Sequence, residues 1–194
     1  MVIAVDFGRV AAEPNPLVRN WSSILQVLGA SLLIALCAQI KVTLPFTPVP
    51  ITMQTLAILL VGATLGSRKG ALAVLAYFSE ILMGLPVLSN AAIDPLVFLG
   101  PKAGYVLGFL VQAYCMGWMV ERMKVFSVSR VFLAGLVACT LEMSLGVLGL
   151  APYVGWNNVL WMGVYPFLVG EIVKVCVMCY ILKRSSFASI EQHG

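Results

Sequence analysis

Long apolar runs, separated by short polar or proline-rich stretches, dominate the chain. A membrane-spanning helix needs about 20 mostly apolar residues, with about 17 as a lower bound. Six segments meet this condition, at about 22–40, 50–66, 70–88, 103–120, 131–150 and 159–182. The pattern predicts an all-α integral membrane protein, a bundle of six transmembrane helices. We expect three regions: an N-terminal cytoplasmic segment (1–21), the membrane domain (22–182) and a cytoplasmic tail (183–194).

Basic residues orient this predicted bundle. One set of chain ends and loops holds most of them: Arg9, Arg19, Arg68, Lys69, Arg122, Lys124, Arg130, Lys183 and Arg184. The opposite loops hold only Lys41 and Lys102. Because cytoplasmic loops carry an excess of lysine and arginine, both termini are expected in the cytoplasm.

Composition changes the picture by excluding whole classes of protein. The chain is 61% hydrophobic and 10% charged, whereas soluble domains carry about 25% charged residues. The only histidine, His193, is next to the C-terminus, which argues against histidine-based catalysis and ordinary zinc sites. No phosphate-binding loop motif is present, so the chain cannot itself couple ATP. We expect a multi-pass protein of the cell membrane that is not an enzyme, with no cofactor, no metal and no nucleic-acid partner.

The first outer loop, "KVTLPFTPVP", is rich in proline. Pro45, Pro48 and Pro50 prevent a helix from continuing through it and favour a stiff extended segment at the membrane surface. Irregular backbone at this depth must be buried in protein or lie beside water. The loop is therefore expected to be a lid or pocket wall, with a simple connector as the alternative.

Four ionisable residues lie within the apolar segments, where each costs about 2.5–3.5 kcal/mol. They are Glu80, Glu142, Glu171 and Lys174. Glu171 and Lys174 are i, i+3 neighbours on one helical face, so they form either an internal ion pair or a polar site. Glu80 faces a cavity or reaches water. For Glu142, a helix-packing or protonated role is favoured over ligand contact.

Pro166 bears on the choice between an ion pair and a site. Proline is favoured in the first turn of a helix, so a break near 163–166 would start a new helix there. Glu171 would then lie about 8 Å below that start, at pocket depth from the outer face. A carboxylate and an ammonium suit a neutral ligand with N–H donors and a carbonyl, such as a urea or amide.

Other candidate ligand residues lie in or beside the outer loops. Lys102 suits a carboxylate, and Asn90 can both donate and accept hydrogen bonds. The remaining lining is expected to be apolar and aromatic, with Phe46, Phe98, Tyr105, Tyr153 and Trp156 as candidates. In the first helix, Ser31 and Ala35 have the small-xxx-small spacing that lets helices approach closely, which favours internal packing over a contact with another protein.

Several motifs together resemble one family. They are "AQIKVTLPFTPVPITMQTLAILLVGATLGSRKGALAVLAYF" (38–78), "GLPVLSN" (84–90), "GPKAGYVLGF" (100–109) and "PFLVGEIVK" (166–174). They look like the BioY family, the biotin-specific membrane component of energy-coupling factor (ECF) importers. The resemblance runs from about residue 22 to residue 182.

The resemblance implies a six-helix substrate-binding subunit that captures biotin at the outer face, under the first loop. It also implies docking onto a transmembrane coupling subunit with two ATPase subunits, a contact that Ser31 and Ala35 would serve. Glu171, where the family usually has aspartate, would accept the ureido N–H groups, and Lys174 would donate to the ureido carbonyl. Asn90, Lys102, Tyr105 and Phe46 are the further ligand residues.

Rival functions remain at this stage. The same fold could bind another vitamin, such as thiamine or riboflavin, although Lys102 and Lys174 disfavour a cationic ligand. A stand-alone facilitator would need no ATPase. An intramembrane enzyme with Glu171 or Glu142 as a base is disfavoured, because no histidine or metal cluster supports it.

Overall fold

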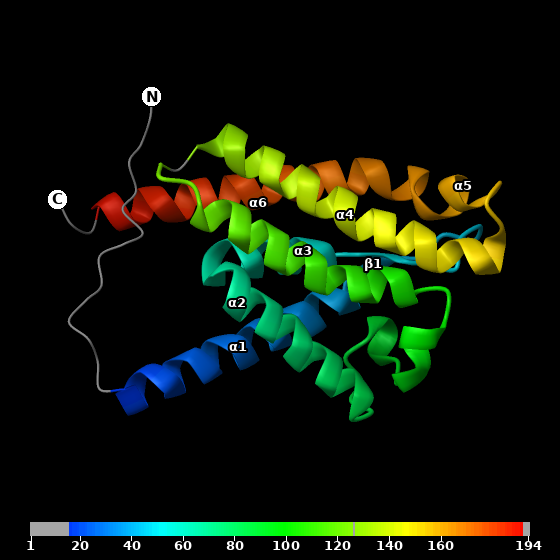
Figure 1. Cartoon of the computed structure of the whole chain (residues 1–194), viewed down its shortest axis with the longest axis horizontal. Coiled ribbons are helices and arrows are strands. Elements are labelled where there is room, and N and C mark those ends of the chain that lie inside the picture. The colour runs from blue at the N-terminus through cyan, green and yellow to red at the C-terminus, as the bar shows by residue number, and fades with distance from the viewer. Residues whose placement is uncertain (1–15, 126, 192–194) are drawn as a thin grey trace.

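Apolar helices make up most of the molecule (Figure 1). The structure is a computed structural model and describes residues 16–125 and 127–191. Its helices are α1 (Pro16–Gln39), α2 (Gln54–Leu82), α3 (Ala103–Glu121), α4 (Val128–Val154), α5 (Val159–Gly163) and α6 (Tyr165–Glu191). In this part of the chain, five helices or helix pairs are long and apolar enough to cross a membrane. The prediction of an α-helical membrane protein is therefore confirmed.

The helix α2 contains a break at Gly66, where φ is 82° and ψ is 176°. The chain folds back at this residue. A hydrogen bond of 2.9 Å from Gln54 Nε2 to Tyr77 Oη shows that the two parts of α2 lie side by side. In an unbroken helix, the 23 residues between them would span about 34 Å. Ile58 and Val74 belong to the same buried cluster, as this fold-back requires. α2 thus consists of two antiparallel arms, Gln54 to Leu65 and Ser67 to Leu82.

Glu121, at the end of α3, holds the turn between the two arms. Its Oε1 accepts a hydrogen bond of 2.7 Å from the Ser67 backbone N–H, and its Oε2 accepts one of 2.8 Å from Ser67 Oγ. The first N–H groups of a helix have no partner within the helix, so the Glu121 carboxylate caps the second arm. A Cβ at position 66 would collide with this carboxylate, and only glycine readily adopts the backbone angles there.

Close backbone contacts join α3 to α4. A Cβ on Gly104 would meet the backbone of Leu145 and Gly149, and a Cβ on Gly108 would lie 3.0 Å from the Glu142 carbonyl oxygen. Small residues permit this approach in a membrane, where packing rather than the hydrophobic effect holds helices together. The contact fixes the part of α4 that carries Glu142.

The helix α1 packs against α2 and the short η1 turn (Ser89–Ala91). Ser31 is fully buried in this contact and donates a hydrogen bond to Glu80 Oε1 on the second arm of α2. Ala35 packs beside it, in the cluster that includes Ile58 and Tyr77. Ser31 and Ala35, the predicted small residues of α1, therefore lie inside the molecule. Glu80 lines neither of the cavities described below and is hydrogen-bonded to Ser31.

The proline-rich loop forms no helix, as expected. The residues at its two ends pair as a two-stranded ladder. β1 (Lys41–Val42) pairs antiparallel with β2 (Ile51–Thr52), with Lys41 opposite Thr52. Between 83 and 102 the chain carries only 3₁₀ turns, η1 and η2 (Pro95–Leu99). These loops and α5 lie at one end of the molecule, whereas the basic ends of α3, α4 and α6 gather at the other (Figure 1).

Several predicted boundaries need correction. The segment expected at 70–88 ends at Leu82, and the expected gap at 67–69 reduces to a break at Gly66, because the next residues are already helical. α4 continues through Pro152 to Val154, beyond the predicted end at residue 150. Proline removes a backbone donor and its ring crowds the carbonyl four residues earlier, which agrees with α4 ending two residues after Pro152. Of the predicted termini, 1–15 and 192–194, with His193, lie outside the described residues.

Candidate functional site

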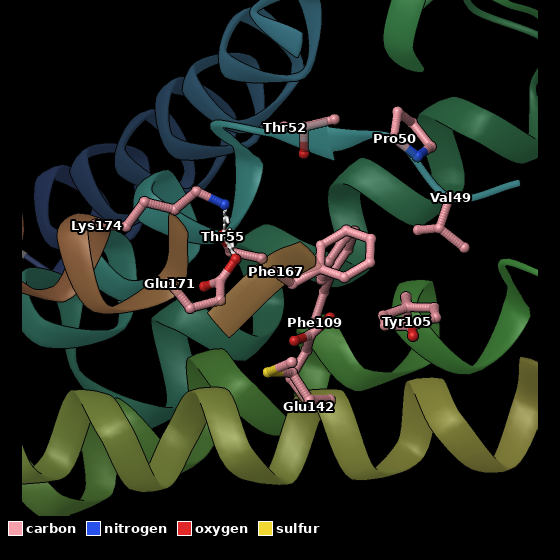
Figure 2. Close-up of a pocket in the computed structure, with 11 residues that line it drawn as sticks. Val49, Pro50, Thr52, Thr55, Tyr105, Phe109, Glu142, Phe167, Glu171 and Lys174 are labelled. Atoms are coloured by element: carbon pink, nitrogen blue, oxygen red, sulfur yellow. Dashed lines mark hydrogen bonds and ion pairs between the residues drawn. The ribbon is translucent and has the colours of Figure 1, made fainter. Parts of the chain in front are cut away.

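A cavity lies among α2, α3, α4 and α6, beneath the proline-rich loop. Its polar lining consists of Thr52, Thr55, Tyr105, Glu142, Glu171 and Lys174, and its apolar lining of Val49, Pro50, Phe109, Met143 and Phe167. Its mixed polar and apolar lining is typical of small-molecule sites. We call it the inner cavity (Figure 2).

Glu171 and Lys174 form a buried ion pair on α6, with 2.7 Å between Glu171 Oε1 and Lys174 Nζ. Thr55 joins both of them: its hydroxyl donates to Glu171 Oε1 at 2.9 Å and accepts from Lys174 Nζ at 2.8 Å. All three residues are at most 6% exposed. Figure 2 shows the three side chains converging from α6 and from the first arm of α2.

Behind the pair, Cys139 Sγ lies 3.5 Å from Glu171 Oε2 and donates to it. Gln112, which is fully buried, donates to Cys139 Sγ at 3.4 Å. Sulfur hydrogen bonds are weak, so this side restrains Glu171 less than Thr55 and Lys174 do. The network holds the Glu171 carboxylate at one end of the inner cavity.

Glu142 enters the inner cavity from α4, on the side opposite Thr55 (Figure 2). It is 3% exposed, yet its carboxyl makes no hydrogen bond or ion pair with any residue that the structure describes. The packing role favoured from sequence therefore describes only part of its position. Its backbone packs on Gly108, but its side chain lines the cavity.

The break between α5 and α6 shapes the far wall. Val164 leaves the helical conformation, α6 begins at Tyr165, and Pro166 stands in its first turn, as expected. The Phe167 N–H bonds to the Val164 carbonyl instead of the Gly163 carbonyl. The Gly163 oxygen accepts a hydrogen bond of 2.7 Å from Tyr105 Oη, which fixes the Tyr105 ring in the cavity wall.

A second cavity, which we call the outer cavity, lies beside the first and toward the loop of residues 83–102. Both cavities are lined by Val49, Pro50, Thr52, Tyr105 and Phe109, which form the partition between them. Lys102, Asp94 and Ser89 line only this outer cavity. Lys102 and Asp94 therefore lie in the outer cavity, and the Glu171–Lys174 ion pair lies in the inner cavity.

The structure brings some of the residues predicted from the sequence to the two cavities and leaves others outside them. Glu171, Lys174 and Tyr105 line the inner cavity, and Tyr105 and Lys102 line the outer one. Asn90 is exposed at a positive φ of 66° in the η1 turn, next to Ser89, and lines neither cavity. Phe46 is 52% exposed and also lines neither. Because Ser31 and Ala35 are buried, α1 would have to move before they could touch another subunit.

Three other aromatic candidates also lie apart from the cavities. Phe98 packs edge-on against Phe78, and Tyr153 and Trp156 are exposed. Thr55, Phe109 and Phe167 are lining residues that sequence reasoning missed, because threonine and phenylalanine are ordinary in apolar helices. Glu142 carried a signal, a charge in mid-helix, but its direction could not be read from the sequence.

Apolar helices around a buried ion pair and a mixed cavity define a class: membrane proteins that bind a small molecule. The BioY family profile matches residues 12–189. The chain belongs to the BioY family, whose members are transport proteins and not enzymes.

Relatives support this membership. The chain is 37% identical to the biotin transporter BioY of Rhodobacter capsulatus over 169 residues, covering 75% of this chain and 86% of the relative. It is 32% identical to the biotin transporter BioY of Rhizobium etli, covering 79% and 87%. Its fold resembles the crystal structure of the S-component for biotin from an ECF-type ABC transporter, with a TM-score of 0.80, 22% identity, and coverage of 89% and 94%.

Proposed function

We propose that this protein binds biotin at the outer face of the cell membrane and delivers it for uptake. The observation that carries the proposal is the buried set of Glu171, Lys174 and Thr55. A lysine ammonium has three donors, and Lys174 uses two of them on Thr55 and Glu171. One donor is left for a carbonyl oxygen in the inner cavity.

Glu171 keeps a matching acceptor. A carboxylate has about four lone-pair sites, and Glu171 uses three on Thr55, Lys174 and Cys139. One donor and one acceptor side by side suit a urea or amide, and biotin carries a cyclic urea. The apolar surfaces of Phe109 and Phe167 suit its ring system.

The outer cavity supports the other half of the ligand. Biotin has an acyl chain that ends in a carboxylate, and Lys102 is the cation of the outer cavity. The shared partition of Val49, Pro50 and Tyr105 would have to open for the acyl chain of biotin to pass between the cavities. The proline-rich loop, which carries Val49 and Pro50, is the segment that would move.

The topology is part of the same proposal. With the two arms of α2 as separate crossings, the chain would cross the membrane six times and place both termini in the cytoplasm, where the basic helix ends gather. Relatives named as biotin transporters, and the fold shared with an ECF-type S-component, favour a substrate-capture subunit. It would act with an ECF transmembrane coupling subunit and two ATPase subunits.

The proposal is tested by titrating biotin into the purified protein in a calorimeter, beside Lys174→Ala and Glu171→Gln. Removing a hydrogen bond to a charged group costs about 1.5–3 kcal/mol, so each variant should bind at least about tenfold more weakly. Lys183→Ala, on the part of α6 outside both cavities, is the control and should bind normally. Failure of the folded wild-type protein to bind biotin would refute the proposal.

The transport mode needs a second measurement. Biotin uptake by cells that express this chain alone should be lower than uptake by cells that also express the coupling and ATPase subunits. Equal uptake in the two strains would instead identify a stand-alone facilitator.

A further inference from the structure

Glu142 is the polar group of the inner cavity that the proposed function leaves unused. It is 3% exposed and lines the cavity together with Glu171 and Lys174. The other polar side chains there are already engaged: Thr55 with the ion pair, Thr52 with Gln54, and Tyr105 with the Gly163 carbonyl. The Glu142 carboxyl has no such partner among residues 16–125 and 127–191.

A buried polar group without a partner is unfavourable in the folded protein. Glu142 packs closely against Gly108, where a Cβ would lie 3.1 Å from Glu142 Cγ. The Glu142 side chain points into the cavity (Figure 2). The structure thus contains an acceptor that is aimed at the ligand space and not used by the protein.

The hydrogen-bond inventory shows what this acceptor is for. A cyclic urea presents two N–H donors and one carbonyl. Lys174 has one donor left for the carbonyl, and Glu171 has one lone pair left for an N–H. The second N–H of the urea needs another acceptor, and Glu142 is the unpartnered one on the cavity wall.

We infer that Glu142 is a further substrate-binding residue, which accepts one ring N–H of the ligand while Glu171 accepts the other. The inference rests on the proposed function, because it takes a cyclic urea as the ligand. It makes the site selective for ureas with both nitrogens unsubstituted. A site built to hydrogen-bond an N–H group rejects analogues that lack it, because its own buried groups are then left unpaired.

The test uses biotin and two analogues, each with a methyl group on one of the two ring nitrogens. Their dissociation constants are measured by calorimetry for the wild type and for Glu142→Leu, which has a similar volume and no acceptor. Glu142→Leu should bind biotin at least about tenfold more weakly. The penalty for methylating one particular nitrogen should fall in the variant, while the penalty for methylating the other should stay unchanged.

Ser144→Ala is the matched control, because Ser144 is exposed on the same helix and donates to the Thr140 carbonyl at 2.7 Å. Its affinity for biotin should stay within about twofold of the wild type. If Glu142→Leu does not purify as a folded protein, Glu142→Gln is used in the same way. Its neutral amide still accepts, so a loss of about three- to tenfold is expected.

The outcomes separate the two proposals. If the wild type binds biotin but the Glu142 variants bind it equally well, or if both methyl penalties are unchanged, the inference is overturned and the proposed function stands. If the folded wild type does not bind biotin, both are overturned.

Discussion

At the scale of single residues, hydroxyl groups determine how three carboxylates are held. Ser31 donates to Glu80, Ser67 to Glu121, and Thr55 to Glu171. A buried ion pair gains stability only when further hydrogen bonds satisfy its charges. Thr55 provides this for both members of the Glu171–Lys174 pair, so the pair depends on a residue of another helix.

Thr55→Val keeps the shape of the side chain and removes the hydroxyl. We expect biotin binding to weaken by about 1.5–3 kcal/mol, because Lys174 and Glu171 each lose a charged hydrogen bond and the pair loses its alignment. Calorimetry of the purified variant measures the change. Thr64→Val is the control, since the Thr64 hydroxyl is exposed and donates to the Leu60 carbonyl of its own helix. Equal binding by both variants would contradict the role of Thr55.

Part of the site was predictable residue by residue. Glu171 and Lys174 were recognisable because charges in an apolar helix are costly and so need a reason. Thr55 and Phe109 were not recognisable, since their side chains are common on every face of a membrane helix. Phe46 and Asn90 illustrate the converse: a loop sequence shows which residue types are available, but not which way the loop turns them.

At the scale of elements, breaks in helices shape the site more than the helices do. Gly66 reverses α2, so the first arm, which carries Thr55, lies beside the second arm. The α5–α6 break frees the Gly163 carbonyl that positions Tyr105. The Pro166 signal made the second break predictable. The break at Gly66 was predicted as a gap at 67–69, because the local sequence does not reveal that Glu121 on another helix caps Ser67.

Gly66→Ala should destabilise the protein more than Gly155→Ala. Both glycines have φ near +80°, where another residue costs about 1–3 kcal/mol. A Cβ at Gly155 would meet nothing within 4 Å, whereas one at Gly66 would displace the Glu121 carboxylate. The lost cap adds about 1.5–3 kcal/mol. Thermal unfolding in detergent should show the larger drop for Gly66→Ala, and equal drops would show that Glu121 contributes no stability there.

At the scale of the whole molecule, the two ends differ in chemistry. The basic helix ends lie at one end, and the proline-rich loop and the 3₁₀ turns lie toward the other (Figure 1). Val49 and Pro50 of the proline-rich loop line both cavities. The charge pattern predicted this division, because basic residues are distributed by the sidedness of the membrane. It could not predict that Val49 and Pro50 divide the ligand space into two cavities, since that depends on how a loop packs on α3.

Orientation is testable with a membrane-impermeant maleimide on intact cells. In a variant whose native cysteines are replaced, we expect Asp94→Cys to be labelled from outside, because Asp94 is exposed in the loop at the cavity end. Lys124→Cys, at the basic end, should be labelled only after the cells are permeabilised. The reverse pattern would place the cavities toward the cytoplasm.

The pairing of carboxylates with hydroxyls has a consequence for how the protein is made. A ribosome releases the chain from its N-terminus, and each of the three hydroxyls precedes its acid, by 49, 54 and 116 residues. When Glu80, Glu121 or Glu171 leaves the ribosome, its donor has already been synthesised and inserted. For these three acids the hydroxyl donor is therefore made before the charge, and the ammonium of Lys174 follows Glu171 by only three residues. Glu142 is the exception in this order of biogenesis, because the partner we assign to it arrives only after synthesis is complete.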